Sequence, residues 1–180
     1  MNGLTSDTVI IDSGIFVHFV GRQQKFNPHG HLGELLGRLA LDKIQLSIDA
    51  RGEIRSEYQR IVVPMIQSGF QTGNELEVLR YWMSPDNQTE VNVSPTGELM
   101  QAIKRVIHEQ SEKVDRFFVA VAFTRGRILV TNDMLHIVEG PDRERKLGHR
   151  RDRLRKAAKK HSSAGAEILD GREAHSRLGE

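Results

Sequence analysis

Four acidic side chains of this chain could share a divalent metal ion: Asp12, Glu57, Asp115 and Asp133. Asp12 and Asp133 each end a short apolar run that is typical of a strand buried on both faces. Parallel strands end at one edge of a sheet, so we expect these two carboxylates to lie side by side there. Mg²⁺ and Mn²⁺ prefer oxygen ligands, whereas a carboxylate cluster without an ion repels itself. A bound ion would generate a hydroxide nucleophile and offset charge in a phosphoryl transition state.

The elements that must position these acids alternate between strand and helix patterns. Strands are predicted at residues 9–12, 44–49, 128–133 and 166–170, and helices at 32–41, 53–66, 75–82 and from Ser94-Pro95 to about 110. Pro64 should bend or end its helix near Val63. Residues 84–95 are expected to form a polar connection. The run Phe117 to Phe123 fits either a buried strand or a buried helix. The alternation favours an α/β fold with a parallel sheet.

Length and composition fit one domain. The chain has 180 residues and no cysteine, which excludes disulfides, thiolate zinc sites and a cysteine nucleophile. We find no signal-peptide pattern and no apolar stretch of the ~18 residues that a membrane helix needs. A cytoplasmic location is therefore expected.

One segment is strongly basic. Residues 143–160 hold ten Lys or Arg against two acids, a net charge of +8, while the rest of the chain carries −6. Such an imbalance favours a face that contacts the phosphates of a polyanion without reading sequence. A solvated helix face or a site for an acidic protein remains the alternative. The predicted nucleic-acid contacts are Arg150, Arg151, Arg153, Arg155, Lys156, Lys159 and Lys160.

The order and spacing of these features over roughly residues 7 to 138 resemble the PIN-domain ribonucleases. The resemblance rests on Val9-Ile10-Ile11-Asp12-Ser13, on Glu57-Tyr58, on Asp115 followed by Phe117-Phe118-Val119-Ala120-Val121-Ala122, and on Ile128-Leu129-Val130-Thr131-Asn132-Asp133. Two segments depart from the pattern. Residues 69–95 match nothing that we can name, and the basic insertion is longer than a minimal member would have.

The resemblance implies a three-layer α/β/α sandwich with a mainly parallel sheet, in which Phe117 to Phe123 is helical and Asp115 stands at its start. It implies that the four acids bind one or two Mg²⁺ or Mn²⁺ ions and hydrolyse phosphodiester bonds of single-stranded RNA. Ser13, Thr131 and Asn132 match polar positions that support the acids. Residues 1–180 would then form a single PIN-like domain, with a basic helical insertion at about 140–162 before a last short strand.

Each acid also has an ordinary structural interpretation. Asp12 and Asp133 could cap strand ends, Asp115 could cap a helix, and Glu57 could be a solvated acid with Glu53 as its competitor. Asp49 is expected to have a turn role, because Gly52 follows it closely. His29 and His31 are expected at the surface, and His136 is a weak candidate for contacting substrate phosphate.

Two other functions stay open. One is a catalytically inactive PIN-like scaffold that binds RNA or protein. The other, a haloacid-dehalogenase-like phosphatase, is disfavoured because Gly14 stands where its second acid belongs. An antitoxin or other protein partner remains open because toxin ribonucleases share the PIN fold. A homo-oligomer also remains open.

Overall fold

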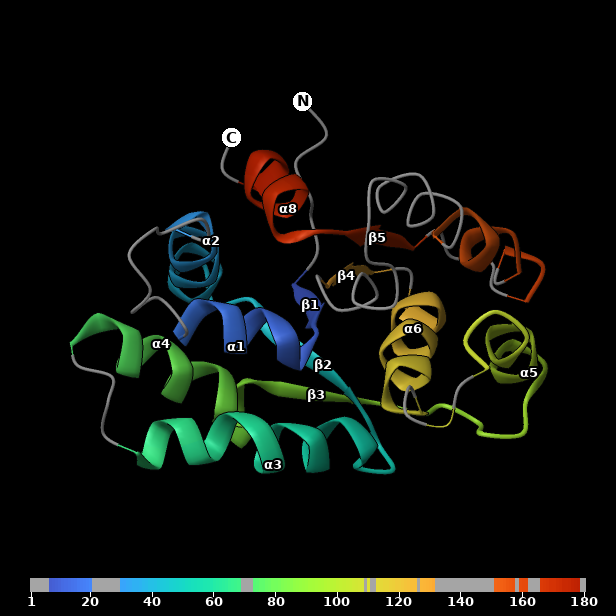
Figure 1. Cartoon of the computed structure of the whole chain (residues 1–180), viewed down its shortest axis with the longest axis horizontal. Coiled ribbons are helices and arrows are strands. Elements are labelled where there is room, and N and C mark those ends of the chain that lie inside the picture. Colours follow the sequence, from blue (N-terminus) through green and yellow to red (C-terminus); the bar gives the residue numbers. More distant parts are fainter. Residues whose placement is uncertain are drawn as a thin grey trace.

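The computed structural model describes residues 7–20, 30–68, 73–108, 110, 113–125, 127–131, 151–157, 159–161 and 166–178. Its described strands form one parallel sheet in the order β3-β2-β1-β4-β5 (Figure 1). The strands are β1 Thr8–Ile11, β2 Gln45–Asp49, β3 Gln88–Val91, β4 Ile128–Val130 and β5 Glu167–Leu169. Helices flank this sheet, which confirms the predicted α/β/α sandwich.

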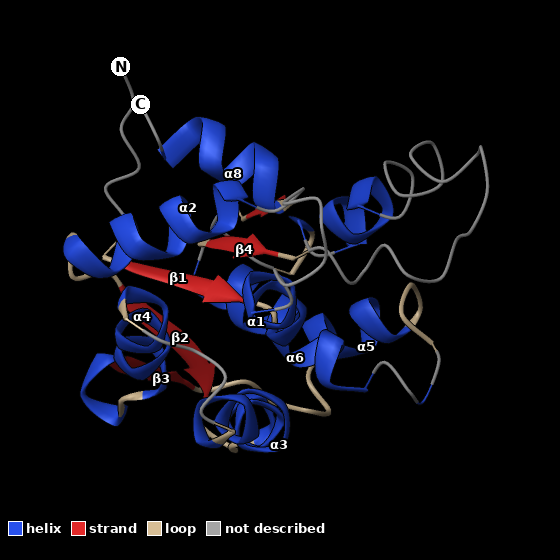
Figure 2. Ribbon diagram, turned by 60° about the vertical axis from the view of Figure 1, so that its left-hand side comes forward, coloured by secondary structure: helices blue, strands red, loops and turns tan. Residues whose placement is uncertain are grey.

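The helices separate into groups around the sheet (Figure 2). They are α1 Ser13–Val20, α2 Gly30–Leu41, α3 Glu53–Gln67, α4 Asn74–Met83, α5 Glu98–Lys104, α6 Lys113–Arg125 and α8 Gly171–Leu178, and residues 151–157 are also helical. Helix α6 packs against β1, β2, β3 and β4, with α5 beside it. On the other side, α2 contacts α1, α4 and α8. None of the described helices is long and apolar enough to cross a membrane.

The run from Phe117 to Phe123 lies in α6, as the PIN resemblance implies, and not in a strand. Every residue from Arg116 to Phe123 is buried. A helix between the sheet and α5 has little solvent-facing surface, so its sequence lacks a polar stripe. This explains why the pattern alone left helix and strand open.

The strand order reverses at β1. The chain builds β1, β2 and β3 outward in one direction, and then returns to place β4 on the other side of β1. Ile10 pairs with Leu129 and Ile11 with Val130, so β1 and β4 end at the same level. In open parallel sheets, this switch point at the carboxyl edge is where ligand sites form.

The predictions for residues 84–95 and for the helix that follows them were wrong. Residues 84–95 are not only a polar connection, because they contain the short helical turn η1 Pro85–Asn87 and the edge strand β3. Polar residues are tolerated in β3 because three of its four residues are not buried. Helix α5 begins at Glu98, because the Gly97 N–H donates to the Ser94 carbonyl in a turn (3.2 Å) that precedes the helix. It also ends earlier than predicted, at Lys104.

Helix α3 continues through Pro64 to Gln67. Pro64 is exposed, and its carbonyl accepts the N–H of Ser68 at 2.9 Å, so the turn beyond the proline closes. Of the two predicted effects of Pro64, a bend or an end near Val63, the end does not occur.

Helix α8 packs very closely on α2. A Cβ added at Gly171 would lie 2.3 Å from Cδ2 of Leu32, which is fully buried. Gly37 of α2 has more room, since a Cβ there would lie 4.0 Å from Val78. A side chain at position 171 would therefore force the buried Leu32 of α2 to shift, whereas one at position 37 would only touch Val78 of α4.

Candidate metal centre

Asp12 lies at the switch point, directly after β1. Its N–H donates to the Val130 carbonyl at 2.9 Å, and its side chain is 4% exposed. The Oδ1 atom accepts the Gly14 N–H (3.2 Å) and the Ser13 hydroxyl (3.4 Å), and Oδ2 accepts the Thr131 hydroxyl. Because it precedes the first residue of α1, the carboxylate caps this helix, where negative charge is favourable. Capping leaves a metal role open.

Glu57 projects from α3 toward the same point. Its side chain is 14% exposed, and its Oε1 atom lies 3.4 Å from the Ser13 hydroxyl that also contacts Asp12. A serine hydroxyl has one hydrogen and can donate it to only one of the two carboxylates at a time. The two acids therefore converge on one hydroxyl that satisfies only one of them.

Tyr58 fixes the position of Glu57. Its hydroxyl donates to the Ile11 carbonyl at the end of β1, and its ring meets Phe16 edge-on at 5.7 Å and Phe118 at 6.0 Å. Burial raises the pKa of Tyr58 well above its usual value, and the negative charges of Asp12, Glu57 and Asp49 raise it further. The Glu57-Tyr58 pair is visible in the sequence, but the contact by which the tyrosine joins α3 to β1 is not.

Asp49 positions the N-terminal end of α3. The carboxylate is 1% exposed, and it accepts the N–H groups of Glu53 at 3.1 Å and Ile54 at 2.7 Å. Its carbonyl accepts the N–H of Gly52, whose φ of 82° suits glycine. The expected turn role is confirmed, and the side chain also caps the helix that carries Glu57.

Glu53 does not replace Glu57 in the site. Its carboxylate pairs with Lys113 at 2.9 Å, which joins α3 to the first turn of α6. Asp115 lies in that same first turn and is half-buried. Within the described part of the chain, however, no three Asp, Glu or His side chains are grouped closely enough to hold a metal ion. The structure thus brings together Asp12 and Glu57 but does not bring Asp115 close enough to complete a set of three.

Several predicted residues lie outside the described residues. They are Asn132, Asp133, His136, Arg150 and His29, so the proposed role of Asp133 stays a prediction. The last described residue after β4 is Thr131, two positions before Asp133. His31, in contrast, lies on α2, 6.1 Å from the ring of His175 on α8.

The donor set fits a hard divalent ion held mainly by two carboxylates. Asp12, Glu57, Ser13 and Thr131 all present oxygen atoms, the ligand type that Mg²⁺ and Mn²⁺ prefer. Mg²⁺ commonly uses one or two carboxylates and completes its octahedron with waters and substrate phosphate. The described residues therefore suit an ion that keeps water ligands.

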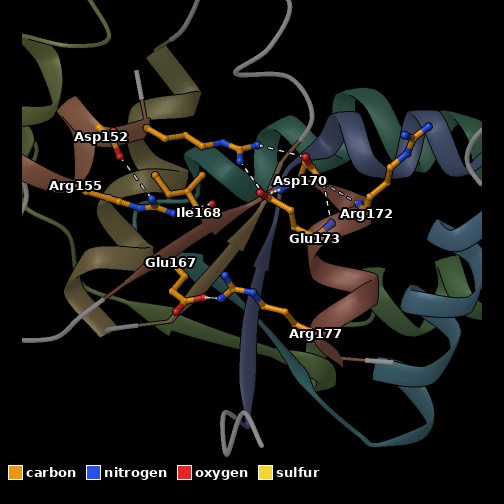
Figure 3. A network of polar contacts seen from close by, with 9 residues as sticks. Asp152, Arg155, Glu167, Ile168, Asp170, Arg172, Glu173 and Arg177 are labelled. Atoms are coloured by element: carbon orange, nitrogen blue, oxygen red, sulfur yellow. Dashed lines mark hydrogen bonds and ion pairs between the residues drawn. The ribbon is translucent and has the colours of Figure 1, made fainter. Parts of the chain in front are cut away.

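Two of the predicted nucleic-acid contacts dock the basic segment onto the protein (Figure 3). Arg151, with its side chain 15% exposed, pairs with Glu173 at 2.8 Å and Asp170 at 3.7 Å. Arg155 donates to the Ile168 carbonyl at 3.4 Å. These contacts place residue 151 near the carboxyl end of β5, at the same sheet edge as Asp12.

The other described basic residues of this segment point outward. Leu154 is fully buried against the core, whereas the four remaining side chains are exposed: Arg153, Lys156, Lys159 and Lys160. The basic helix thus has a docked side and a cationic side. Only the second is available for a polyanion.

Comparison with models of protein families, with curated proteins and with solved structures finds no match. The resemblance to PIN nucleases consequently rests on the motifs of the chain. The strand order and the Asp12–Glu57 geometry stand independently of it.

Proposed function

We propose that this protein is a metal-dependent endoribonuclease that hydrolyses phosphodiester bonds of single-stranded RNA, with Mg²⁺ or Mn²⁺ as its cofactor. The observation that carries the proposal is the convergence of Asp12 and Glu57 on the Ser13 hydroxyl. This pair lies at the switch point of the sheet, where α/β enzymes form their sites. Asp133, which lies outside the described residues, is proposed to complete the acidic set.

In this proposal each residue has a defined task. Asp12 and Glu57 hold the ion, while Ser13 and Thr131 orient the carboxylates. Tyr58 and Asp49 hold α3 in place against the ends of β1 and β2. A divalent ion, when bound, would promote ionisation of a water nucleophile and offset the charge of the phosphoryl transition state.

RNA as the substrate is supported by two arguments. The first is the resemblance to PIN ribonucleases. The second is the exposed cationic side of residues 151–160, which approaches the carboxyl edge of the sheet through Arg151. Lysine and arginine there would contact phosphates without selecting bases.

A non-catalytic scaffold that binds RNA or protein is the second candidate. Its support is that the described residues group two acids and not three, and that the contacts of Asp12 are sufficient for a helix cap. In that case the fold would present the basic helix and the acids would have structural roles.

A cleavage assay separates the two candidates. Mixed-sequence single-stranded RNA is incubated with pure protein in Mn²⁺, in Mg²⁺ and in chelator. Asp12→Asn and Asp133→Asn are compared with Asp86→Asn, which changes an exposed acid in η1 near the amino end of β3. We expect metal-dependent cutting by the wild type and Asp86→Asn only. RNA binding without cutting in any metal would support the scaffold, and equal cutting by all variants would refute the site.

A further inference from the structure

The two oxygens of Glu57 face different partners. Oε1 contacts the Ser13 hydroxyl beside Asp12, whereas Oε2 pairs with Nη2 of Arg60 at 2.6 Å. The Arg60 side chain is 70% exposed and that of Glu57 only 14%. The guanidinium therefore lies on the solvent side of the acid pair.

Glu57 cannot bind a divalent ion and the Arg60 guanidinium equally well at the same time. A divalent ion shared by Asp12 and Glu57 would repel a guanidinium held at the same carboxylate. An exposed ion pair is worth only about 0.2–1 kcal/mol, so the ion would displace Arg60 at small cost. The displaced side chain would stay near the site, because Arg60 is fixed on α3 one turn after Glu57.

We infer that Arg60 is a phosphate-binding residue of this site, held by Glu57 in the free protein and released to the substrate phosphate when the ion takes Glu57. The inference rests on the proposed nuclease function. It deepens that function by assigning a residue to the phosphodiester and by coupling metal binding to phosphate recognition.

Charge balance supports this assignment. Asp12, Glu57 and Arg60 together carry one negative charge in the free protein, and a divalent ion changes the sum over these three residues to one positive charge. A guanidinium beside the acids thus offsets the negative charge that would repel a phosphodiester. Arginine is also suited to the task, since its planar fork of N–H donors matches the oxygens of a phosphate.

Arg55 provides a matched control on the same helix. It too forms an ion pair, with Glu90 on β3 at 2.9 Å, and its side chain is 41% exposed. This pair ties α3 to the edge strand and is separate from the contacts that Asp12 and Glu57 make with Ser13. Arg60→Gln and Arg55→Gln therefore remove the same charge from two different places.

The test measures Mn²⁺ binding by calorimetry and RNA cleavage under single turnover for Arg60→Gln, Arg60→Lys and Arg55→Gln. Arg60→Gln should bind Mn²⁺ about twofold to fivefold more tightly, because a competing cation is gone. It should nevertheless cut RNA at least about tenfold more slowly at saturating Mn²⁺. Arg60→Lys should recover part of the rate, and Arg55→Gln should match the wild type in both measurements.

Opposite changes in metal affinity and rate distinguish this role from a structural one, which would weaken both. The inference is overturned, with the nuclease proposal intact, if the wild type cuts RNA and Arg60→Gln behaves like Arg55→Gln. If the wild type neither binds Mn²⁺ nor cuts RNA, both proposals fail together.

Discussion

Tyr58→Phe tests the geometry that sets Glu57 beside Asp12. The change keeps the ring, and so its contacts with Phe16 and Phe118, but removes the hydroxyl that donates to the Ile11 carbonyl. Losing a buried hydrogen bond and leaving its acceptor without that donor costs about 1–2 kcal/mol. We expect this loss in the free energy of unfolding at pH 7.

The same variant should show a distinctive pH dependence. Because burial and the nearby acids raise the pKa of Tyr58 well above 10.0, the folded protein keeps this proton while the unfolded chain loses it. The wild type therefore loses about 1.4 kcal/mol of stability per pH unit above pH 10 through this group. Tyr58→Phe lacks the group and escapes that loss. The two stabilities should cross about one unit above pH 10.

Urea unfolding of both proteins between pH 7 and pH 11 measures the difference. The chain has one other tyrosine, Tyr81, whose pKa is also raised by burial. Tyr81→Phe is therefore unfolded under the same conditions, as the comparison for Tyr58→Phe. A difference between wild type and Tyr58→Phe that stays constant from pH 7 to pH 11 would refute the buried, acid-flanked environment of this hydroxyl.

Three further predictions concern the elements around the site. Gly171→Ala should lower the free energy of unfolding by about 1–3 kcal/mol in thermal melts, because its Cβ clashes with α2. Gly37→Ala should raise that free energy by about 0.5–1 kcal/mol. A Gly171→Ala variant as stable as the wild type would contradict the close α2–α8 contact. Asp49→Ala removes two N–H acceptors at the start of α3 and should cost about 1–2 kcal/mol in urea unfolding, and an unchanged midpoint would show that the cap is dispensable. Arg151→Ala should lower stability by about 1 kcal/mol, less at high salt, while Arg153→Ala should leave stability unchanged and weaken RNA binding in a filter assay. The reverse pattern for these two arginines would mean that the docked and exposed sides of the basic helix are misassigned.

The sequence predicted the parts of the fold that have a clear apolar pattern. Short segments rich in apolar residues located β1, β2, β4 and β5 to within three residues at each end. It could not find β3, because an edge strand buries little and its residues Gln88 to Val91 carry polar side chains that resemble a loop. Helix α3 also continues through Pro64, where the proline predicted a bend or an end.

The site was predictable to a similar degree. The end of β1 identified Asp12, and the PIN resemblance identified Thr131, whose hydroxyl contacts Asp12 although the two residues are far apart in sequence. That Glu57 and not Glu53 contacts Ser13 beside Asp12 depends on the rotation of α3, which is set by the Asp49 cap and the Tyr58 hydroxyl. Likewise, charge counting could not separate the docked Arg151 from the exposed Arg153, because that difference depends on Asp170 and Glu173.

Mn²⁺ titration followed by calorimetry, with wild type, Asp12→Asn, Glu57→Gln and Asp86→Asn, tests the central claim most directly. We expect the wild type and Asp86→Asn to bind Mn²⁺ equally, because Asp86 is exposed in η1, away from the switch point. Asp12→Asn and Glu57→Gln should each weaken binding at least about tenfold, since each removes a charged ligand. Equal Mn²⁺ affinity in all four proteins would contradict a metal centre at Asp12 and Glu57.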